Sequence, residues 1–196
     1  MNQNNTADKS IVDQALIAEW VRQAIDGDQQ AFTQIYEHFL PSVHKRVWYV
    51  IPTQDVEDVT QEIFIAMMRS LHSFRGDAKF STWLRVITNR QVANYYRKRS
   101  RADHDKNVAL EDAESMNAPE LSQPANPVDY DDIMLLRNGL RNIPEHYQEI
   151  LLMRFAEGMR FQDIANDLNK NLDAAKSLFR RAVEALRDEI GEDPHV

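Results

Sequence analysis

Apolar residues recur at intervals of three and four along most of the chain, and no segment shows the sustained alternation that is typical of a strand. The pattern therefore predicts an all-α protein. Gly27, Pro41 and Pro52 separate the helices of the first half, and Pro144 suits a first helical turn. The predicted helices span 12–25, 29–39, 42–50, 55–72 and 81–99, and then 131–142, 144–157, 161–168 and 172–189.

A polar, acidic segment divides this helical pattern into two small modules. Residues 103–132 contain nine acidic residues against Lys106 alone, together with three prolines, and show little helical periodicity. Such a composition predicts an extended chain that repels itself. The predicted organisation is a disordered N-terminus (1–10), a first helical module (11–102), an acidic flexible linker (103–130), a second helical module (131–190) and a tail (191–196).

Composition excludes several classes of protein. The chain has 196 residues, 43% of them hydrophobic, and carries a formal charge of -8. It has no cysteine, which excludes disulfides, thiol nucleophiles and thiolate zinc sites. No apolar run approaches the roughly 18 to 20 residues that span a bilayer, and the polar start MNQNNTADKS lacks the features of a signal peptide. We expect a cytoplasmic protein without membrane insertion.

The sequence gives little evidence of catalytic or metal-binding residues. The histidines are dispersed and form no HExxH-like or i,i+4 pair, so we expect no metal site, no cofactor and no catalytic residue. The acidic residues near Asp55 and Glu62 could suggest a metal site, but a solvated helix face is the simpler interpretation. The six histidines are His38, His44, His72, His104, His146 and His195.

The predicted helix 55–72 has an apolar stripe and an unusual polar side. The stripe consists of Val56, Val59, Ile63, Met67 and Leu71. Ile65 lies in the middle of the opposite side, with Met68 beside it. Ile65 is either a stray surface aliphatic, which is common, or an apolar anchor ringed by polar groups, as at a protein-docking face. The polar groups around it are Asp55, Asp58, Gln61, Glu62 and Arg69.

The predicted helix 81–99 concentrates positive charge in an acidic protein. Between residues 78 and 102 there are seven basic residues and no carboxylate. Clustered cations suit a polyanion, because phosphate contacts release condensed counterions, and aromatic rings among them can stack on unpaired bases. Trp83 and Tyr95 can also be read simply as core residues. The expected buried stripe is Leu84, Ile87, Thr88, Gln91, Val92 and Tyr95, and the expected exposed side presents Arg85, Asn89, Arg90, Tyr96 and Arg97.

The segment FQDIANDLNKNLDAAKSLFRRAVEAL fits a helix-turn-helix. The small Ala165 permits a close helix crossing, and the asparagines beside Lys170 tolerate the positive φ of a turn. The expected inward residues of the second helix are Leu172, Ala175, Phe179, Ala182 and Leu186. The residues available to a major groove are Lys176, Ser177, Arg180 and Arg181.

The order of these motifs resembles one family. DGDQQAFTQIYEHF, DVEDVTQEIFIAMM and FRGDAKFSTWLRVITNRQVANYYRKR resemble region 2 of the bacterial sigma-70 family of RNA polymerase sigma factors. LRNIPEHYQEILLMRFAEGMRFQDIANDL and the helix after it resemble region 4. Nothing resembles regions 1.1 or 3, which indicates the small extracytoplasmic-function (ECF) group. The resemblance covers about 27–101 and 133–190.

The resemblance implies a subunit that binds core RNA polymerase and directs promoter-specific initiation. Region 2 would dock on the β′ clamp helices, and its loop and basic helix would recognise and melt the promoter −10 element. The implied polymerase-binding residues are Asp55, Asp58, Gln61, Glu62, Ile65 and Met68. The implied −10 residues are Phe74, Arg75, Lys79, Phe80, Trp83, Arg85, Asn89, Arg90, Tyr96 and Arg97.

Region 4 would read the −35 element as duplex DNA and contact the β flap, and the family often has an anti-sigma factor as a partner. The acidic linker resembles the connector between the family's regions 2 and 4. The sequence departs from the family pattern at Asn94, Asn169, Ala175 and Leu178, and the last three bear on −35 recognition. The implied −35 residues are Lys170, Lys176, Ser177, Arg180 and Arg181.

Two other classes of function are weighed against this one. A stand-alone helix-turn-helix regulator would bind duplex DNA tightly without polymerase, whereas the acidic net charge favours a protein that binds promoters only with core enzyme. An enzyme is the weakest alternative, because no catalytic constellation stands out in the sequence.

Overall fold

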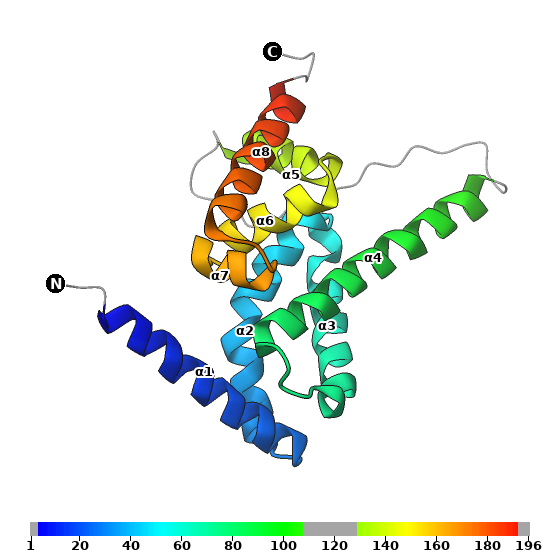
Figure 1. Ribbon diagram of the computed structural model, residues 1–196. Coiled ribbons are helices and arrows are strands. Elements are labelled where there is room, and N and C mark those ends of the chain that lie inside the picture. Colours follow the sequence, from blue (N-terminus) through cyan, green and yellow to red (C-terminus); the bar gives the residue numbers. More distant parts are fainter. Residues whose placement is uncertain (1–3, 108–128, 192–196) are drawn as a thin grey trace.

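The computed structural model describes the backbone of residues 4–107 and 129–191, and the side chains of 14–101 and 133–191 (Figure 1). Within these ranges the chain forms α-helices, two short 3₁₀ helices and no strand, which confirms the predicted all-α class. The elements are α1 (Asn4–Ile25), α2 (Gln29–Val50), η1 (Thr53–Asp55), α3 (Val56–Ser70), η2 (Leu71–Ser73), α4 (Phe80–Asn107), α5 (Asp129–Asn142), α6 (Glu145–Phe155), α7 (Phe161–Asp167) and α8 (Leu172–Gly191).

Several predicted boundaries are wrong. Helix α1 begins at Asn4, so residues 4–10 are helical where the sequence predicted disorder, and α4 runs to Asn107 instead of ending near 99. Helix α5 begins at Asp129, so the ends of the predicted linker are helical. The middle of that linker, 108–128, lies outside the described residues, as do 1–3 and 192–196.

The predicted break at Pro41 is also wrong, because α2 is one continuous helix from Gln29 to Val50. An interior proline costs a helix about 3 kcal/mol, since it removes a backbone hydrogen bond and clashes with the preceding turn. Phe39 and Val43 are buried on either side of Pro41, whereas Pro41 itself is exposed. Burial of each such side chain contributes about 1.5–3 kcal/mol. Tertiary packing therefore holds the helix together across the proline.

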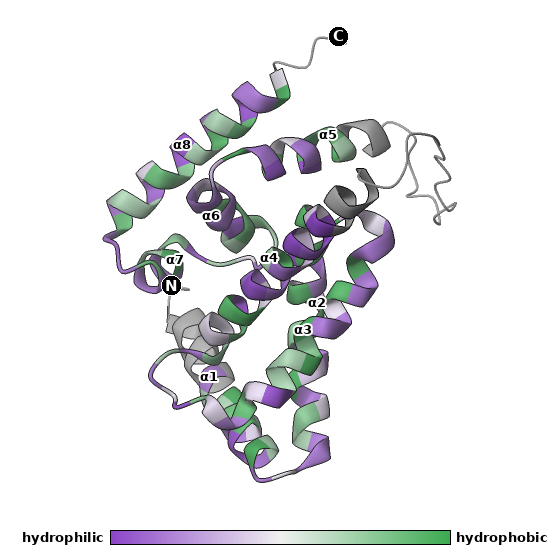
Figure 2. Ribbon diagram, turned by 90° about the vertical axis from the view of Figure 1, so that its right-hand side faces the viewer, coloured by the Kyte–Doolittle hydropathy of each residue, from purple (hydrophilic) through white to green (hydrophobic). Residues whose placement is uncertain are grey.

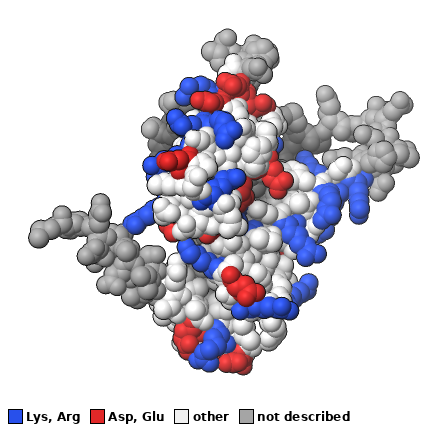
Figure 3. Space-filling view, viewed as in Figure 1, with Lys and Arg blue, Asp and Glu red and all other residues white. Residues whose placement is uncertain are grey.

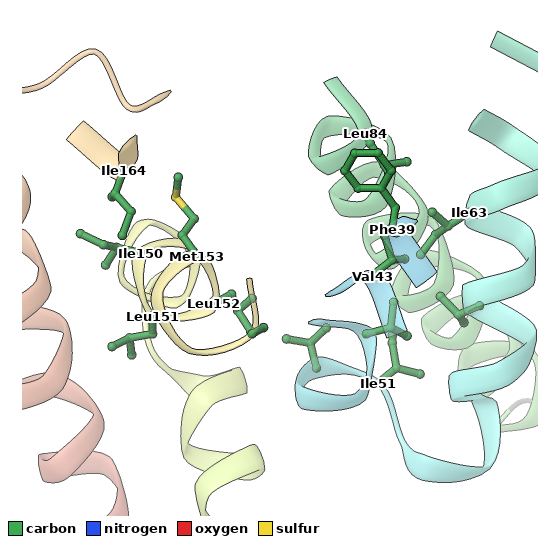
Figure 4. Close-up of a cluster of buried hydrophobic side chains, with 14 of the residues drawn as sticks. Phe39, Val43, Ile51, Ile63, Leu84, Ile150, Leu151, Leu152, Met153 and Ile164 are labelled. Atoms are coloured by element: carbon green, nitrogen blue, oxygen red, sulfur yellow. The ribbon is translucent and has the colours of Figure 1, made fainter. Parts of the chain in front are cut away.

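Helices α2, α3 and α4 form the core of the first module, which we define as residues 4–107. The apolar stripe predicted for helix 55–72 is confirmed, since all five of its members are buried in and just after α3. Helix α4 supplies Leu84 and Thr88 to the same core, both of them predicted, while Ile87 and Val92 of the same stripe are half-buried. Figure 4 shows Phe39, Val43, Ile63 and Leu84 meeting between the three helices.

The second module, residues 129–191, is built around α6. Ile150 and Met153 of α6 are fully buried with Ile164 of α7, as Figure 4 shows. Ala165 is fully buried, which confirms its predicted place at a close crossing, and Ala175 and Ala182 of α8 are buried with it. In Figure 2, hydrophilic and hydrophobic bands alternate along α8, in keeping with a helix that has one inward side. None of the helices in the described ranges is long and apolar enough to cross a membrane.

The turn between α7 and α8 has the geometry that its asparagines predict. Asn169 adopts a positive φ of 52°, in the left-handed region that asparagine tolerates better than most residues. The Lys170 amide donates to the Ala165 carbonyl at 2.8 Å and closes the end of α7. Asn171 then caps α8, because its Oδ1 accepts a hydrogen bond from the Ala174 amide at 2.7 Å.

Replacing Asn171 with Ala is expected to lower the free energy of unfolding by about 1 kcal/mol, because it leaves an amide of the first turn of α8 without its capping acceptor. Urea denaturation followed by circular dichroism measures the change. Asn171→Asp keeps a capping oxygen and should unfold at nearly the same urea concentration as the unmodified chain. A loss of similar size in both variants would contradict the capping role.

Candidate nucleic-acid and protein interfaces

One candidate interface is the outer side of α3. Ile65 and Met68 are 38% and 50% exposed, although both are large apolar residues. Asp58, Gln61 and Glu62 are exposed along the same helix. The structure therefore brings together an apolar pair and a polar surround, as the sequence predicted for a docking face.

Aromatic and basic residues of α4 contact the carboxylates beside this outer side of α3. Asp55 is half-buried and accepts a hydrogen bond from the Tyr95 hydroxyl at 2.6 Å. Arg99 lies 3.8 Å from the Asp55 carboxylate, and Lys98 lies 3.4 Å from the Glu62 carboxylate. Burial and the hydrogen bond to Asp55 raise the pKa of the Tyr95 hydroxyl. Asp55 is thus anchored to α4, while Asp58 and Gln61 are exposed to solvent.

Aromatic residues of the loop before α4 and of the first turn of α4 form one cluster. The Phe74 ring lies 5.4 Å from the Phe80 ring and 5.3 Å from the Trp83 ring, and Phe80 lies 5.3 Å from Phe39 of α2. Phe80 is 5% exposed, so the prediction that it faces DNA is wrong: it belongs to the core. Phe74 and Trp83 are half-buried against it, which leaves part of each ring accessible.

Tyr96 lies further along α4 and is 38% exposed. Its hydroxyl donates to the carbonyl oxygen of Val50, the last residue of α2. Burial raises the pKa of this hydroxyl. The side chain is thus held in place by its polar end while part of the residue is open to solvent.

The basic residues predicted to face DNA fall into two groups. Arg90 and Arg97 are exposed, as predicted, and Arg75 of the loop before α4 is exposed too. Figure 3 shows Lys and Arg side chains gathered over α4. Arg85 is only 7% exposed, so its prediction as an exposed residue is wrong.

Carboxylates of the second module cover Arg85. Its Nη2 lies 2.8 Å from Glu157 Oε2, and its Nη1 lies 3.1 Å from Asp167 Oδ2. Thr82, one turn earlier in α4, donates to the same Asp167 carboxylate at 2.9 Å. Although burial opposes the charged form, the attraction and hydrogen bonds of Glu157 and Asp167 outweigh it and raise the pKa of the Arg85 guanidinium.

Arg46 of α2 belongs to the same group of charges and was not predicted from the sequence. Its side chain is buried and bonded to Glu149, and its Nη1 donates to Glu157 Oε1 at 2.6 Å. It also donates to Asn89 Oδ1 at 2.8 Å, and the Asn89 amide donates to Glu149 at 3.1 Å. The sequence did contain a signal, since Arg46 is a lone cation on the apolar stripe of α2 that includes Val43 and Val50.

A second contact joins the modules at the end of α2. Arg137 of α5 is 1% exposed. It donates to the Ile51 carbonyl and to Thr53 Oγ1, and its guanidinium lies 4.6 Å from the centre of the Trp48 ring. Arg141 donates to the Val50 carbonyl at 3.1 Å.

The predicted major-groove surface of the second module lies on α8. Lys176, Arg180 and Arg181 are exposed, as is Lys170 in the turn before them, while Ser177 is half-buried. None of these four cations is in a salt bridge with a carboxylate of the described residues. They leave a cationic stretch on α8 that can approach phosphates and base edges.

No cluster of three or more possible metal-ligating side chains occurs in the described part of the chain.

Comparison with known proteins matches both modules. The family model described as "Sigma-70 region 2" matches residues 35–102, and that described as "Sigma-70, region 4" matches residues 133–186. The chain is 28% identical over 187 residues to the ECF RNA polymerase sigma-E factor of Haemophilus influenzae, covering 93% of this chain and 97% of the relative. The sigma-E factor of Escherichia coli strain K12 is also 28% identical, with 96% of its length covered.

Solved structures share the fold. A structure of CnrH in complex with the cytosolic domain of CnrY matches with a TM-score of 0.62 at 20% identity, covering 91% of this chain and 99% of that one. The sigma factor RpoE in complex with the anti-sigma factor NepR from Bartonella quintana matches with a TM-score of 0.55 at 19% identity, covering 83% and 98%.

Proposed function

Because the chain belongs to the extracytoplasmic-function group of the sigma-70 family, we propose that it binds core RNA polymerase and directs promoter-specific initiation in the cytoplasm. One observation carries this proposal: both sigma modules occur in order along a chain that covers nearly the whole length of two sigma-E factors. In this role the protein has no catalysis of its own, and the polymerase makes the RNA.

The outer side of α3 is the proposed contact with the β′ clamp helices. Ile65 and Met68 supply exposed apolar surface, which is the composition of the buried centre of a protein interface. The flanking carboxylates favour a basic partner surface. The proposed contact residues are Asp55, Asp58, Gln61, Glu62, Ile65 and Met68.

The loop before α4 and the outer side of α4 are the proposed −10 site. Exposed arginines bind the backbone phosphates of the strand, while accessible rings stack on bases that melting has unpaired. Phe80 supports Phe74 and Trp83 from the core side, so its contribution is structural. The exposed members of this site are Arg75, Arg90, Tyr96 and Arg97.

Helix α8 is the proposed reader of the −35 element as duplex DNA. Two of the departures from the family pattern, Ala175 and Leu178, are buried, so they act on packing and not on base contacts. Specificity then depends on Lys176, Ser177, Arg180 and Arg181, with Lys170 at the phosphate backbone. The second module is also the proposed contact with the β flap.

An anti-sigma factor is the proposed regulatory partner. Support comes from the structural likeness to the Bartonella quintana factor, which was solved with the anti-sigma factor NepR. Such a partner would act by competing for the surfaces that polymerase and promoter DNA use.

Reconstituted transcription tests the proposal. Core polymerase supplied with this protein is expected to start transcripts at defined sites on a genomic library, whereas core alone starts at none of them. A gel shift at moderate salt distinguishes this function from the alternative, a stand-alone helix-turn-helix regulator. Such a regulator would bind duplex promoters tightly without polymerase. Initiation unchanged by the protein would overturn the proposal.

A further inference from the structure

A pocket opens between α2 and α3 beside the proposed docking side. The two helices pack side by side (Figure 1). The pocket has a volume of about 440 Å³, within the range of roughly 300–1,000 Å³ that is usual for ligand pockets. Asp58 and Gln61 line it and also belong to the proposed polymerase contact, so the pocket and that contact form one continuous surface. The other lining residues are Tyr36, Leu40, Pro41, His44, Glu57 and Thr60.

Thr60 brings to this pocket a buried polar atom without a partner. The residue is 3% exposed, and its Oγ1 makes no hydrogen bond within the described part of the chain. A buried hydroxyl in this state costs free energy, because it has lost its hydrogen bonds to water and gained no other. A ligand that enters with an N–H donor restores the bond. Thr60 therefore indicates a hydrogen-bonding ligand and not a purely apolar one.

Pro41 adds an unused acceptor on the α2 side. It lies inside α2 and lines the pocket. Proline has no backbone N–H, so the Glu37 carbonyl one turn earlier loses its usual helical donor. The α2 wall of the pocket thus also favours a ligand that donates hydrogen bonds.

The charged groups of the pocket favour a cation. Glu57 and Asp58 are exposed residues of its lining. His44 is the lining residue that can carry positive charge, and its Nε2 lies 2.8 Å from Glu57 Oε1. Asp58 is in no salt bridge with a cation of the described residues. Attraction between unlike charges therefore adds to the effect of the unused acceptors.

Tyr36 forms an aromatic wall that is held in place by α3. Its ring centre lies 4.7 Å from that of Phe64 in an edge-to-face contact, and Phe64 is buried. Tyr36 itself is 37% exposed. Aromatic rings attract guanidinium groups through cation–π interaction and stacking. Together with Leu40 and Pro41, the ring can also cover the apolar stem of a long side chain.

We propose that this pocket is an arginine-binding site, and that its ligand is an arginine side chain of the polymerase's β′ clamp helices. A guanidinium is planar and carries N–H donors only, which matches the hydroxyl of Thr60, the carboxylate of Asp58 and the ring of Tyr36. A lysine is a point charge without the planar donor fork. The inference rests on the proposed function and deepens it: Ile65 supplies the apolar anchor of docking, and the pocket fixes the partner's orientation.

Thr60→Val is the first test, because valine has a similar shape and removes only the buried hydroxyl. We expect the free protein to unfold at the same or a higher urea concentration. Its affinity for purified core polymerase should fall by about tenfold, which corresponds to the loss of one hydrogen bond to a charged group. A threonine that served only the fold would lower stability and affinity together, and that result would overturn the proposal.

Thr88→Val is the matched control. Thr88 is also fully buried, but its hydroxyl donates to the Leu84 carbonyl at 3.0 Å, and it does not line this pocket. The control should bind core polymerase as tightly as the unmodified protein. In the same assay, Tyr36→Leu removes the ring and should weaken binding by roughly three- to tenfold, whereas Tyr36→Phe keeps the ring and should bind normally.

Substitutions on the polymerase identify the ligand. Arginines of the β′ clamp helices are replaced with lysine one at a time, and for one of them we expect about a tenfold loss of affinity for the unmodified protein. The same replacement should have little further effect on the affinity of Thr60→Val, because the shared hydrogen bond is already lost.

The outcomes separate the two proposals. If the unmodified protein does not bind core polymerase, the proposed sigma function is wrong. If it binds, and Thr60→Val and Tyr36→Leu bind equally tightly, only the arginine pocket is wrong. The pocket would also be disproved if no arginine-to-lysine replacement were coupled to Thr60→Val, since the occupant would then be another side chain.

Discussion

Replacing Ile65 with Glu is expected to abolish association with core RNA polymerase while leaving the fold intact. Ile65 is 38% exposed on α3, so a glutamate there meets solvent in the free protein and costs little stability. In the complex the same carboxylate would be buried at the centre of an apolar contact. Burying an unpaired charge costs several kcal/mol, and each 1.4 kcal/mol is a tenfold loss of affinity. Co-purification with tagged core enzyme measures the loss.

The control for this variant is Leu16→Glu. Leu16 is likewise a partly exposed aliphatic on a helix, at 46% exposure, but it belongs to α1 and not to the proposed docking side. Leu16→Glu should co-purify with core enzyme at the unmodified level, and circular dichroism should show both variants folded. Retention of Ile65→Glu on the polymerase would disprove the α3 docking side.

Local patterns in the sequence were sufficient to predict most of the secondary structure. The stripe of α3 and the asparagine turn before α8 depend on neighbours within a few residues, so periodicity and turn chemistry identify them. Pro41 is one of the positions where this fails. Its effect on a helix is local, but the burial of Phe39 and Val43 that overcomes it comes from α3 and α4, which no local pattern contains.

The candidate site was predicted only in part, because contacts between segments far apart in the sequence leave no local pattern. The sequence shows that Arg90 and Arg85 both lie in a carboxylate-free stretch, but not that one is exposed and the other covered. Glu157 and Asp167 lie far along the chain from Arg85, and their contact with it depends on how the modules pack. Arg46 was missed because its partners, Glu149 and Glu157, also come from the second module.

Changing both Arg90 and Tyr96 to Ala is expected to impair open-complex formation far more than core binding. Arg90 is exposed and suited to a backbone phosphate, while Tyr96 is 38% exposed and its hydroxyl is bonded to the Val50 carbonyl. A stacked base is worth about 1–3 kcal/mol per ring. This stacking energy is lost together with the phosphate contact. We therefore expect promoter melting to fall by roughly ten- to a hundredfold.

Permanganate footprinting of unpaired thymines measures melting, and co-purification with core enzyme measures binding in parallel. Tyr96→Phe is the matched control, because it keeps the ring that stacks and removes only the hydroxyl, so it should melt promoters nearly as well as the unmodified protein. The double variant should still co-purify, since α3 is unchanged. Footprints of undiminished intensity would show that this side of α4 does not hold the separated strand, and a melting defect as large in Tyr96→Phe would show that the Val50 contact matters more than stacking.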